Sequence, residues 1–462
     1  MNFRLISVVL LVLNPAYPAS AEESLLDDDE VFSDVYEASA YESDENGIDY
    51  SVEDEWEQGN RSPQDALPED SLPQDSSPED HAASLFKNIR IGFSGDFSQG
   101  QELEIGRLNF NLKYEDAIWP NSYIKLDSKF TYFHQKDDLA EAAGGDYGNA
   151  KVNDAWFQYS YKHCVAKLGY QSLFWGVVEG SYALDIINPL DATEPLLTDY
   201  SEVSQSQNIM LTNCYFSASD FELFYVPKAK VDKYSHKGRM PFEQLESRLD
   251  DEWGVRYSYH LEGIDFTLMY AHLYENTPHL SIDLLDPSYL NLESLRYDLF
   301  GLSFSWAIER LLIEADLAYK KDQHKNQILI IGQPLITESL FEAALGFEYL
   351  TSGNHQFSAG VWFFDARAES LQITSKHSQL WSFSWRKKYL NDTLGLSLLG
   401  GWVKQPERFS LTALAEYELD DYWIISSSIS HVNSTLSNND TQQSTLLSAS
   451  EVSTQLSLKW QY

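Results

Sequence analysis

The chain has 462 residues, a formal net charge of −39 and only two cysteines. This acidic balance excludes a nucleic-acid-binding protein, because a phosphate backbone requires a basic surface, and two cysteines exclude a disulfide-rich scaffold. Aromatic side chains make up 14% of the residues, which is typical of a membrane β-barrel with aromatic girdles. A large barrel can use a chain of this length as one domain.

The first 21 residues have the pattern of a secretory signal peptide. Arg4 precedes an apolar run from Leu5 to Leu13, and the small residues Ala19 to Ala21 supply a cleavage site. The run is much shorter than the roughly 20 residues that a membrane-spanning helix needs, so a membrane anchor is the weaker alternative. We expect a signal peptide over residues 1–21, cleaved after Ala21.

Residues 22–84 form an acidic arm whose composition differs from the rest of the chain. Between Glu22 and Asp80 stand 22 Asp and Glu residues against a single arginine, Arg61. Because high charge with few apolar residues cannot offset the entropy lost on ordering, we expect a disordered, Pro-containing arm. Two roles stay open: a solvated spacer, or a docking segment for a basic periplasmic partner or for divalent cations.

From Phe86 to the end of the chain, apolar residues alternate with polar ones. Examples of one face are Leu108, Phe110, Leu112 and Tyr114; Trp253, Val255, Tyr257 and Tyr259; and Val452, Thr454, Leu456, Leu458, Trp460 and Tyr462. A period of two places alternate side chains on opposite faces of a β-strand. Many runs end in an aromatic residue, where a lipid-facing strand meets the head groups.

The connections between these strands alternate between two classes. Short turns such as 161–163 and 261–263 alternate with long polar segments such as 172–206 and 228–250. Outer-membrane barrels have short periplasmic turns and long outer loops, and their sheets must close because unpaired edges cannot face lipid. The predicted fold is therefore all-β: a transmembrane antiparallel barrel of about 18 strands, or about 16, over residues 85–462 in the bacterial outer membrane.

The least regular stretch, between Cys164 and Cys214, contains the third outer loop, residues 172–206. This loop is long and rich in carboxylates, and charged rings of this kind set the selectivity of channels. We expect it to fold inward and narrow the lumen. The residues expected to form the pore constriction are Trp175, Glu179, Asp185, Asp191 and Glu194.

If the apolar face of each strand meets lipid, the other face lines the lumen. The first three strands would then carry a basic lumen wall of Arg90, Arg107, Lys113, Lys125 and Lys129. Later strands add Arg256, Asp265, Arg296, Asp298, Glu314, Asp316, Glu342 and Glu348. Two interpretations remain: charges that pair with their neighbours, or a basic wall that faces an acidic loop and produces a transverse field.

The general plan resembles that of bacterial porins, in which the third outer loop folds into the lumen. A local string is similar to one in an uncharacterised family of outer-membrane barrels related to alginate-export-type barrels: Gly169, Gln171, Trp175, Gly176, Asn188, Pro189 and Asp191. Tyr170 stands where we would expect Arg, so no basic substrate contact is carried over. The resemblance implies export or uptake through the outer membrane and no particular substrate.

The two cysteines allow one specific bond. Strand parity places Cys164 and Cys214 near the periplasmic ends of two sequential antiparallel strands, about one strand spacing apart. The oxidising periplasm permits a disulfide there, and such a bond would close a ring that contains the third outer loop. The alternative is two unpaired cysteines in the barrel wall, because a one-residue slip in register points them to opposite faces.

The pattern as a whole predicts a channel that passes a small solute or an exported product through a charged, loop-constricted lumen. The alternative is a scaffold or secretion-partner barrel that recruits a periplasmic protein through its acidic arm. An enzyme is not expected, because the histidines lack metal-ligand spacing and no catalytic set stands out. No cofactor or metal is expected. The expected partners are outer-membrane lipid and a small solute, and the oligomeric state stays open.

Overall fold

The structure is a computed structural model of the chain. It describes residues 89–99, 104–135, 147–192, 204–234, 242–283, 286–324, 328–330, 337–366, 376–404, 407–435 and 449–461. The predicted signal peptide, residues 1–21, and the predicted acidic arm, residues 22–84, lie outside these ranges.

Eighteen strands form one continuous antiparallel sheet. They are β1 Ile89–Gln99, β2 Glu104–Trp119, β3 Ser122–Gln135, β4 Tyr147–Tyr161, β5 Cys164–Gln171, β7 Gln207–Tyr215, β8 Ser219–Val226, β10 Glu252–Leu261, β11 Ile264–Tyr274, β14 Arg296–Ile308, β15 Leu311–His324, β17 Thr337–Leu350, β18 Gln356–Ala366, β19 Lys376–Tyr389, β20 Leu394–Val403, β21 Glu407–Glu418, β22 Trp423–Thr435 and β23 Ala449–Gln461. Each strand pairs with its successor in this order, so the sheet is a meander.

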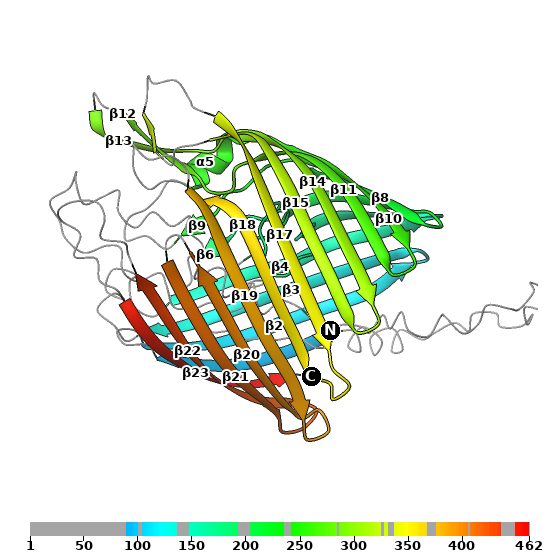
Figure 1. Cartoon of the computed structure of the whole chain (residues 1–462), viewed down its shortest axis with the longest axis vertical. Helices are drawn as coiled ribbons and strands as arrows, with labels where there is room; N and C mark the ends of the chain where they lie inside the picture. The colour runs from blue at the N-terminus through cyan, green and yellow to red at the C-terminus, as the bar shows by residue number, and fades with distance from the viewer. Residues whose placement is uncertain are drawn as a thin grey trace, which may run out of the picture.

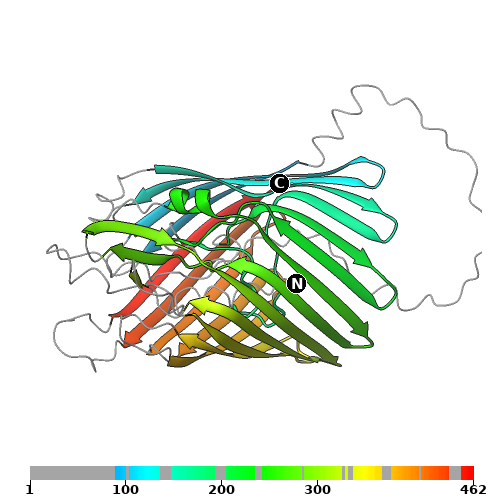
Figure 2. The ribbon, with the colours of Figure 1, turned by 90° about the horizontal axis from the view of Figure 1, so that it is seen from above.

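The first and last strands close the sheet into a barrel. β1 pairs with β23, from Gly92 opposite Gln461 to Gln99 opposite Thr454. Figure 2 shows the blue and cyan strands β1–β4 on the side of the barrel away from the yellow strands β17 and β18. The predicted all-β, closed antiparallel barrel is confirmed, and its strand number is 18.

The outward face of the barrel is apolar. Leu108, Leu268 and Leu456 are each more than half exposed, while their sequence neighbours point inward. A row of exposed aromatic side chains follows the strand ends next to the short turns: Trp119, Tyr161, Tyr215, Tyr349, Tyr389 and Trp423. An apolar belt bordered by aromatic residues is the surface of a lipid-embedded barrel. The predicted location in the bacterial outer membrane is therefore confirmed.

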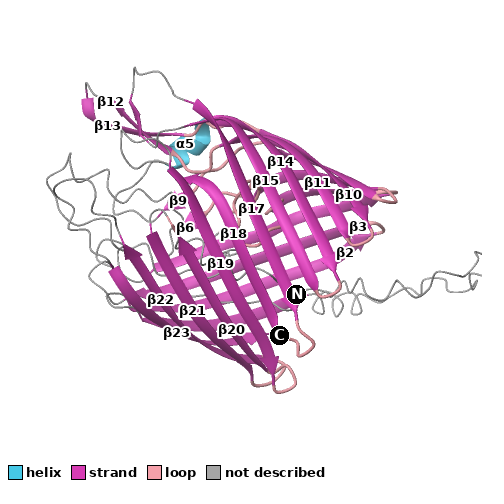
Figure 3. Ribbon diagram, in the orientation of Figure 1, coloured by secondary structure: helices cyan, strands magenta, loops and turns pink. Residues whose placement is uncertain are grey.

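The two ends of the barrel differ. Short turns join the strands at one end, and the other end carries β6 Asp191–Ala192, β9 Lys233–Tyr234, helix α5 Phe242–Arg248, β12 His279–Asp283, β13 Asp286–Glu293 and β16 Ile328–Ile330. Figures 1 and 3 show β12, β13 and α5 together at that second end. The parity of the connections makes it the outer end. No helix in the described ranges is long and apolar enough to cross a membrane.

The interior contains an apolar cluster that the alternation pattern does not predict. Residues of the third outer loop and inward-facing side chains of β7 through β20 belong to one buried apolar cluster, together with Leu414 of β21; its wall members include Ile209, Phe224, Met269, Ala271, Leu273, Leu299, Ala318, Ala344, Trp362, Leu380 and Leu399. We call the inner face of β7–β20 the packed wall. The inner face of β22, β23 and β1–β4 is mainly polar, with Asn109, Thr131, Ser428, Ser430, Gln455 and Ser457, and we call it the polar wall.

Candidate functional site

The third outer loop begins after Gln171 at the end of β5, and its residues 172–192 and 204–206 are described. Leu173, Trp175, Leu184 and Ile187 are buried among inward-facing residues of the packed wall. These contacts place this part of the loop inside the barrel.

A buried carboxylate on the far strand β15 fixes the middle of the loop. Asp316 is fully buried and accepts hydrogen bonds from the backbone amides of Val177, at 3.1 Å, and Val178, at 3.0 Å. The hydroxyl of Ser303 on β14 donates to the same carboxylate at 2.6 Å. Hydrogen bonds to a charged acceptor are stronger than neutral ones, so Asp316 is a main anchor of the loop.

The indole of Trp175 forms a second anchor. Its Nε1 donates to Glu222 on β8 at 2.7 Å, and the guanidinium of Arg256 on β10 lies 3.2 Å from the same carboxylate. The ring packs edge-on against Phe224, with 5.1 Å between ring centroids. A Cβ added at Gly254 would lie 2.5 Å from Phe224 Cε1 and 2.8 Å from both Ala271 Cβ and Trp175 Cη2, so the indole and its wall neighbours together require a glycine at that position.

The loop reaches the wall again at β14 and at β18 and β19. A Cβ added at Gly301 of β14 would lie 2.6 Å from Leu184 Cδ2. Tyr182 packs on Trp362 of β18, with 5.8 Å between ring centroids. Glu179 lies 3.4 Å from the guanidinium of Arg386 on β19. The loop therefore contacts the packed wall along much of its circumference.

Side chains of the loop also form hydrogen bonds to the backbone of the same loop. Asp185 accepts hydrogen bonds from the amides of Trp175 and Gly176, each at 2.8 Å. Asn188 accepts from the Leu173 amide at 2.9 Å and donates to the Leu173 carbonyl at 2.8 Å. Three residues of the sequence string, Trp175, Gly176 and Asn188, thus take part in the internal hydrogen bonds of the loop.

Four side chains from outside residues 172–190 form hydrogen bonds to the backbone of residues 186–190. Asp232 accepts a hydrogen bond from the Leu190 amide at 2.7 Å, and Asn276 donates to the Ile186 carbonyl at 2.7 Å. Gln205 donates to the Leu190 carbonyl, and Gln207 donates to the Ile187 carbonyl, both at 2.7 Å. Asp232 and Asn276 belong to two other outer connections, so these connections and the third outer loop form one packed unit.

The basic residues predicted on the first strands lie on a wall of mixed charge. Lys113 lies 3.5 Å from Asp127, and Lys125 lies 3.1 Å from Asp154 and 3.7 Å from Glu115. Arg107 is buried above the ring of Phe133, and Lys129 stands opposite Lys151 in the strand register. Arg90 stands opposite Lys113. Carboxylates therefore alternate with the basic groups on the polar wall.

Other predicted charges differ in their surroundings. Asp191 pairs through its backbone with Lys233, as β6 and β9 form a short parallel ladder, and Glu194 lies outside the described residues. Inside the barrel, the Glu342 carboxylate accepts hydrogen bonds from Lys320 Nζ at 2.7 Å and from Trp362 Nε1 at 3.2 Å. The expectation that Arg296 and Asp298 line the lumen is wrong.

Arg296 and Asp298 share the outward face of β14 with Phe300 and Leu302, whereas Tyr297 and Leu299 are buried inside. Asp298 accepts a hydrogen bond from Tyr270 at 3.0 Å on the same outward face. Both faces of β14 carry large apolar residues, because the inner face packs against the loop. The apolar face therefore does not identify the lipid side of this strand.

Several anchors were not singled out by sequence reasoning. Glu222, Asp232 and Asn276 bind loop atoms that are 42 to 90 residues away in the chain, and no local pattern marks such contacts. One usable signal was present: Gly254 and Gly301 interrupt the inner faces of their strands, and glycine within a strand often marks a close approach by another segment.

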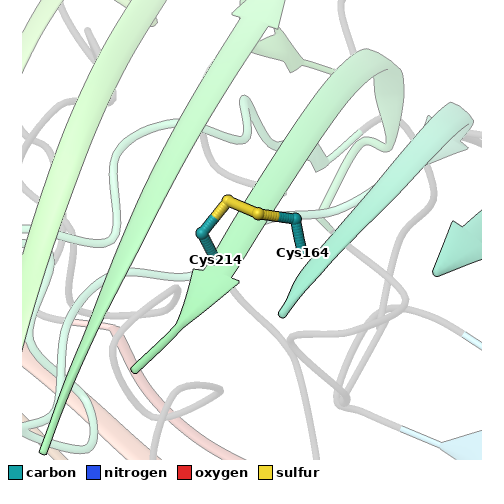
Figure 4. Close-up of a disulfide and its surroundings, with 2 residues drawn as sticks. All are labelled: Cys164 and Cys214. Atoms are coloured by element: carbon teal, nitrogen blue, oxygen red, sulfur yellow. A yellow bond between two sulfur atoms is a disulfide. The ribbon is translucent and has the colours of Figure 1, made fainter. Parts of the chain in front are cut away.

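Cys164 and Cys214 form a disulfide (Figure 4). They stand directly opposite each other in the register of β5 and β7, and both belong to the face that carries the exposed side chains of Leu168 and Met210. The bond therefore lies on the outward surface near the short-turn end. It closes a ring with a sequence separation of 50 residues that includes the whole third outer loop.

Within the described ranges, no group of three or more His, Cys, Asp or Glu side chains is arranged to hold a metal ion. No protein-family model matches the chain, and no curated protein sequence matches it.

The barrel is similar to several solved structures. Pseudomonas aeruginosa OpdQ is 11% identical, with a TM-score of 0.49 over 81% of this chain and 98% of that one. Pseudomonas aeruginosa OccK5 (OpdH) is 11% identical, with a TM-score of 0.47 over 81% and 97%. Salmonella typhi OmpF, in complex with daunomycin, is 10% identical, with a TM-score of 0.42 over 81% and 97%. The likeness is one of fold at low identity, and the porin-like plan is confirmed by the barrel itself: a closed ring of 18 strands that encloses its third outer loop.

Proposed function

We propose that this protein is a porin-like outer-membrane channel through which a small solute or an exported product passes. The path runs between the third outer loop and the polar wall. One observation carries this proposal: the described part of the loop packs along β7–β20 and leaves the inner face of β22, β23 and β1–β4 as the polar side of the barrel.

The predicted constriction residues take two roles in this proposal. Trp175 and Asp185 shape the loop, since both are engaged by anchors and turns. Asp191 and Glu194 supply negative charge to the loop, whereas Glu179 is paired with Arg386 of the packed wall. The basic groups Arg90, Arg107, Lys113, Lys125 and Lys129 supply positive charge to the opposite wall. Charges of both signs in a narrow, low-dielectric passage select among solutes by charge and orientation.

Planar-bilayer recording of the purified barrel tests the proposal. We expect steady open-channel current, and a Lys129→Glu variant should shift the reversal potential under a salt gradient toward cation selectivity. The matched control is Lys321→Glu. Lys321 lies near the outer end of β15, on the outward face opposite Asp298, and its side chain is about half exposed. A silent barrel, or equal shifts in both variants, would overturn the proposed path. Silence together with a co-purifying periplasmic protein would favour the scaffold function.

A further inference from the structure

A groove of about 530 Å³ lies on the lipid-facing surface where the barrel closes. Its apolar rim consists of Phe97, Leu108, Tyr132, Leu456 and Leu458, all of which are exposed on the outside of the barrel. These residues come from β1, β2, β3 and β23, so the groove crosses the seam between the first and last strands.

Two glycines create the groove. Gly95 occupies the outward position between Phe93 and Phe97 on β1, and Gly106 occupies the outward position before Leu108 on β2. The register sets Gly95 opposite Leu108 and Phe97 opposite Gly106, so the glycines are diagonal neighbours. A Cβ at Gly95 would lie 3.5 Å from Leu108, and one at Gly106 would lie 3.6 Å from the His134 carbonyl oxygen. The backbone therefore accepts side chains at both positions without strain, and the space is open.

The groove crosses the apolar belt from the outer ends of β2 and β3 to Leu458 and Ile425, which lie near the short-turn ends of β23 and β22. Gly106 is near the outer end of β2, and His134 is near the outer end of β3, where it is exposed beside the groove. Tyr132 is also exposed there. The groove thus has an apolar floor and rim along the strands and polar side chains at its outer end.

We propose that this groove retains one lipid of the outer leaflet, with an acyl chain in the notch and the head group against Tyr132 and His134. The groove is continuous with the lipid-facing surface, and hydrocarbon is the medium at this depth. An unfilled groove would lose dispersion contacts on its floor and walls. A single flexible chain can enter between the protruding Phe97, Leu108 and Leu456 side chains, whereas the rim holds a flat protein surface away from the floor.

Native mass spectrometry of the barrel, extracted from its own membrane and exchanged into mild detergent, tests this proposal. The wild type should retain a lipid adduct after washing, and a double variant, Gly95→Leu with Gly106→Leu, should lose it. The control is Gly400→Leu, which fills an outward glycine position on β20 where an added Cβ would meet Leu411 at an ordinary 3.7 Å. This variant should keep the adduct.

The mass of the adduct identifies the lipid, and heat-modifiable migration in gels shows that each variant is folded. A lipid adduct of equal abundance in all three folded proteins would overturn the proposal. So would a wild type without any adduct, or an adduct that proves to be a second copy of the chain. If the double variant fails to fold, the single variants Gly95→Leu and Gly106→Leu provide the same comparison, and each should lower the adduct.

Discussion

At the scale of single residues, the interior of this barrel depends on a few buried polar groups with partners far away in the sequence. Asp316 was predicted to face the lumen from the alternation of β15, and it does point inward. Its partners could not be predicted, because they are backbone amides some 138 residues earlier in the chain. Periodicity gives the face of a residue, whereas the contact made on that face depends on tertiary packing.

Asp316→Asn should loosen the loop. The amide oxygen of the variant can still accept from Val177 and Val178, but the substitution removes the charge and places an N–H group where the Ser303 hydroxyl donates in the wild type, so we expect a loss of about 2–3 kcal/mol of anchoring free energy. Single-channel recordings should show larger current fluctuations and a changed conductance. Asp322→Asn, at an exposed position on the same strand, is the control and should record like the wild type. Identical traces for both variants would exclude Asp316 as an anchor.

At the scale of elements, the strands could be predicted and the packing of the loop could not. Alternation and the short turns are dictated by the bilayer, which requires an apolar outside and a closed sheet, so these features are visible in local sequence. The loop carries no such periodicity. The positions of the apolar loop residues Leu173, Trp175 and Ile187 do not indicate which strands they contact. The inner faces of β8, β11 and β14 are apolar because they pack in the same buried cluster as the loop, and this was not visible in the sequence.

The Cys164–Cys214 bond joins the two strands that flank the loop, and its removal should lower stability without altering conductance. In the chain-entropy model a ring of this size is worth about 4 kcal/mol, although the measured effect is often smaller. The double variant Cys164→Ala, Cys214→Ala should convert to the unfolded gel form at a lower temperature than a Met210→Ala control, which removes a lipid-facing side chain from the same strand. Alkylation of the denatured, unreduced wild type should label no thiol. Two labelled thiols would rule out the bond.

At the scale of the whole molecule, the composition of the acidic arm, residues 22–84, differs from that of the barrel sequence. The sequence predicts that the acidic arm is dispensable for insertion, because its composition cannot support a packed core. A protein that lacks residues 22–80 but keeps the signal peptide should therefore assemble into a heat-modifiable barrel in the outer membrane. Fractionation and gel migration before and after heating measure this. Failure of the truncated chain to assemble would show that the arm belongs to the fold.

The close fit between the loop and the packed wall has an evolutionary consequence. Leu184 occupies space left by Gly301, where an added Cβ would lie 2.6 Å from Leu184 Cδ2, so a larger wall residue there is acceptable only with a smaller loop residue. Among homologous sequences this pair should covary, as sites that mutate in concert. Positions on the polar wall such as Ser430 and Ser457 have no such counterpart on the described part of the loop, so they can diversify independently and let related lineages adapt to different solutes on one inherited frame.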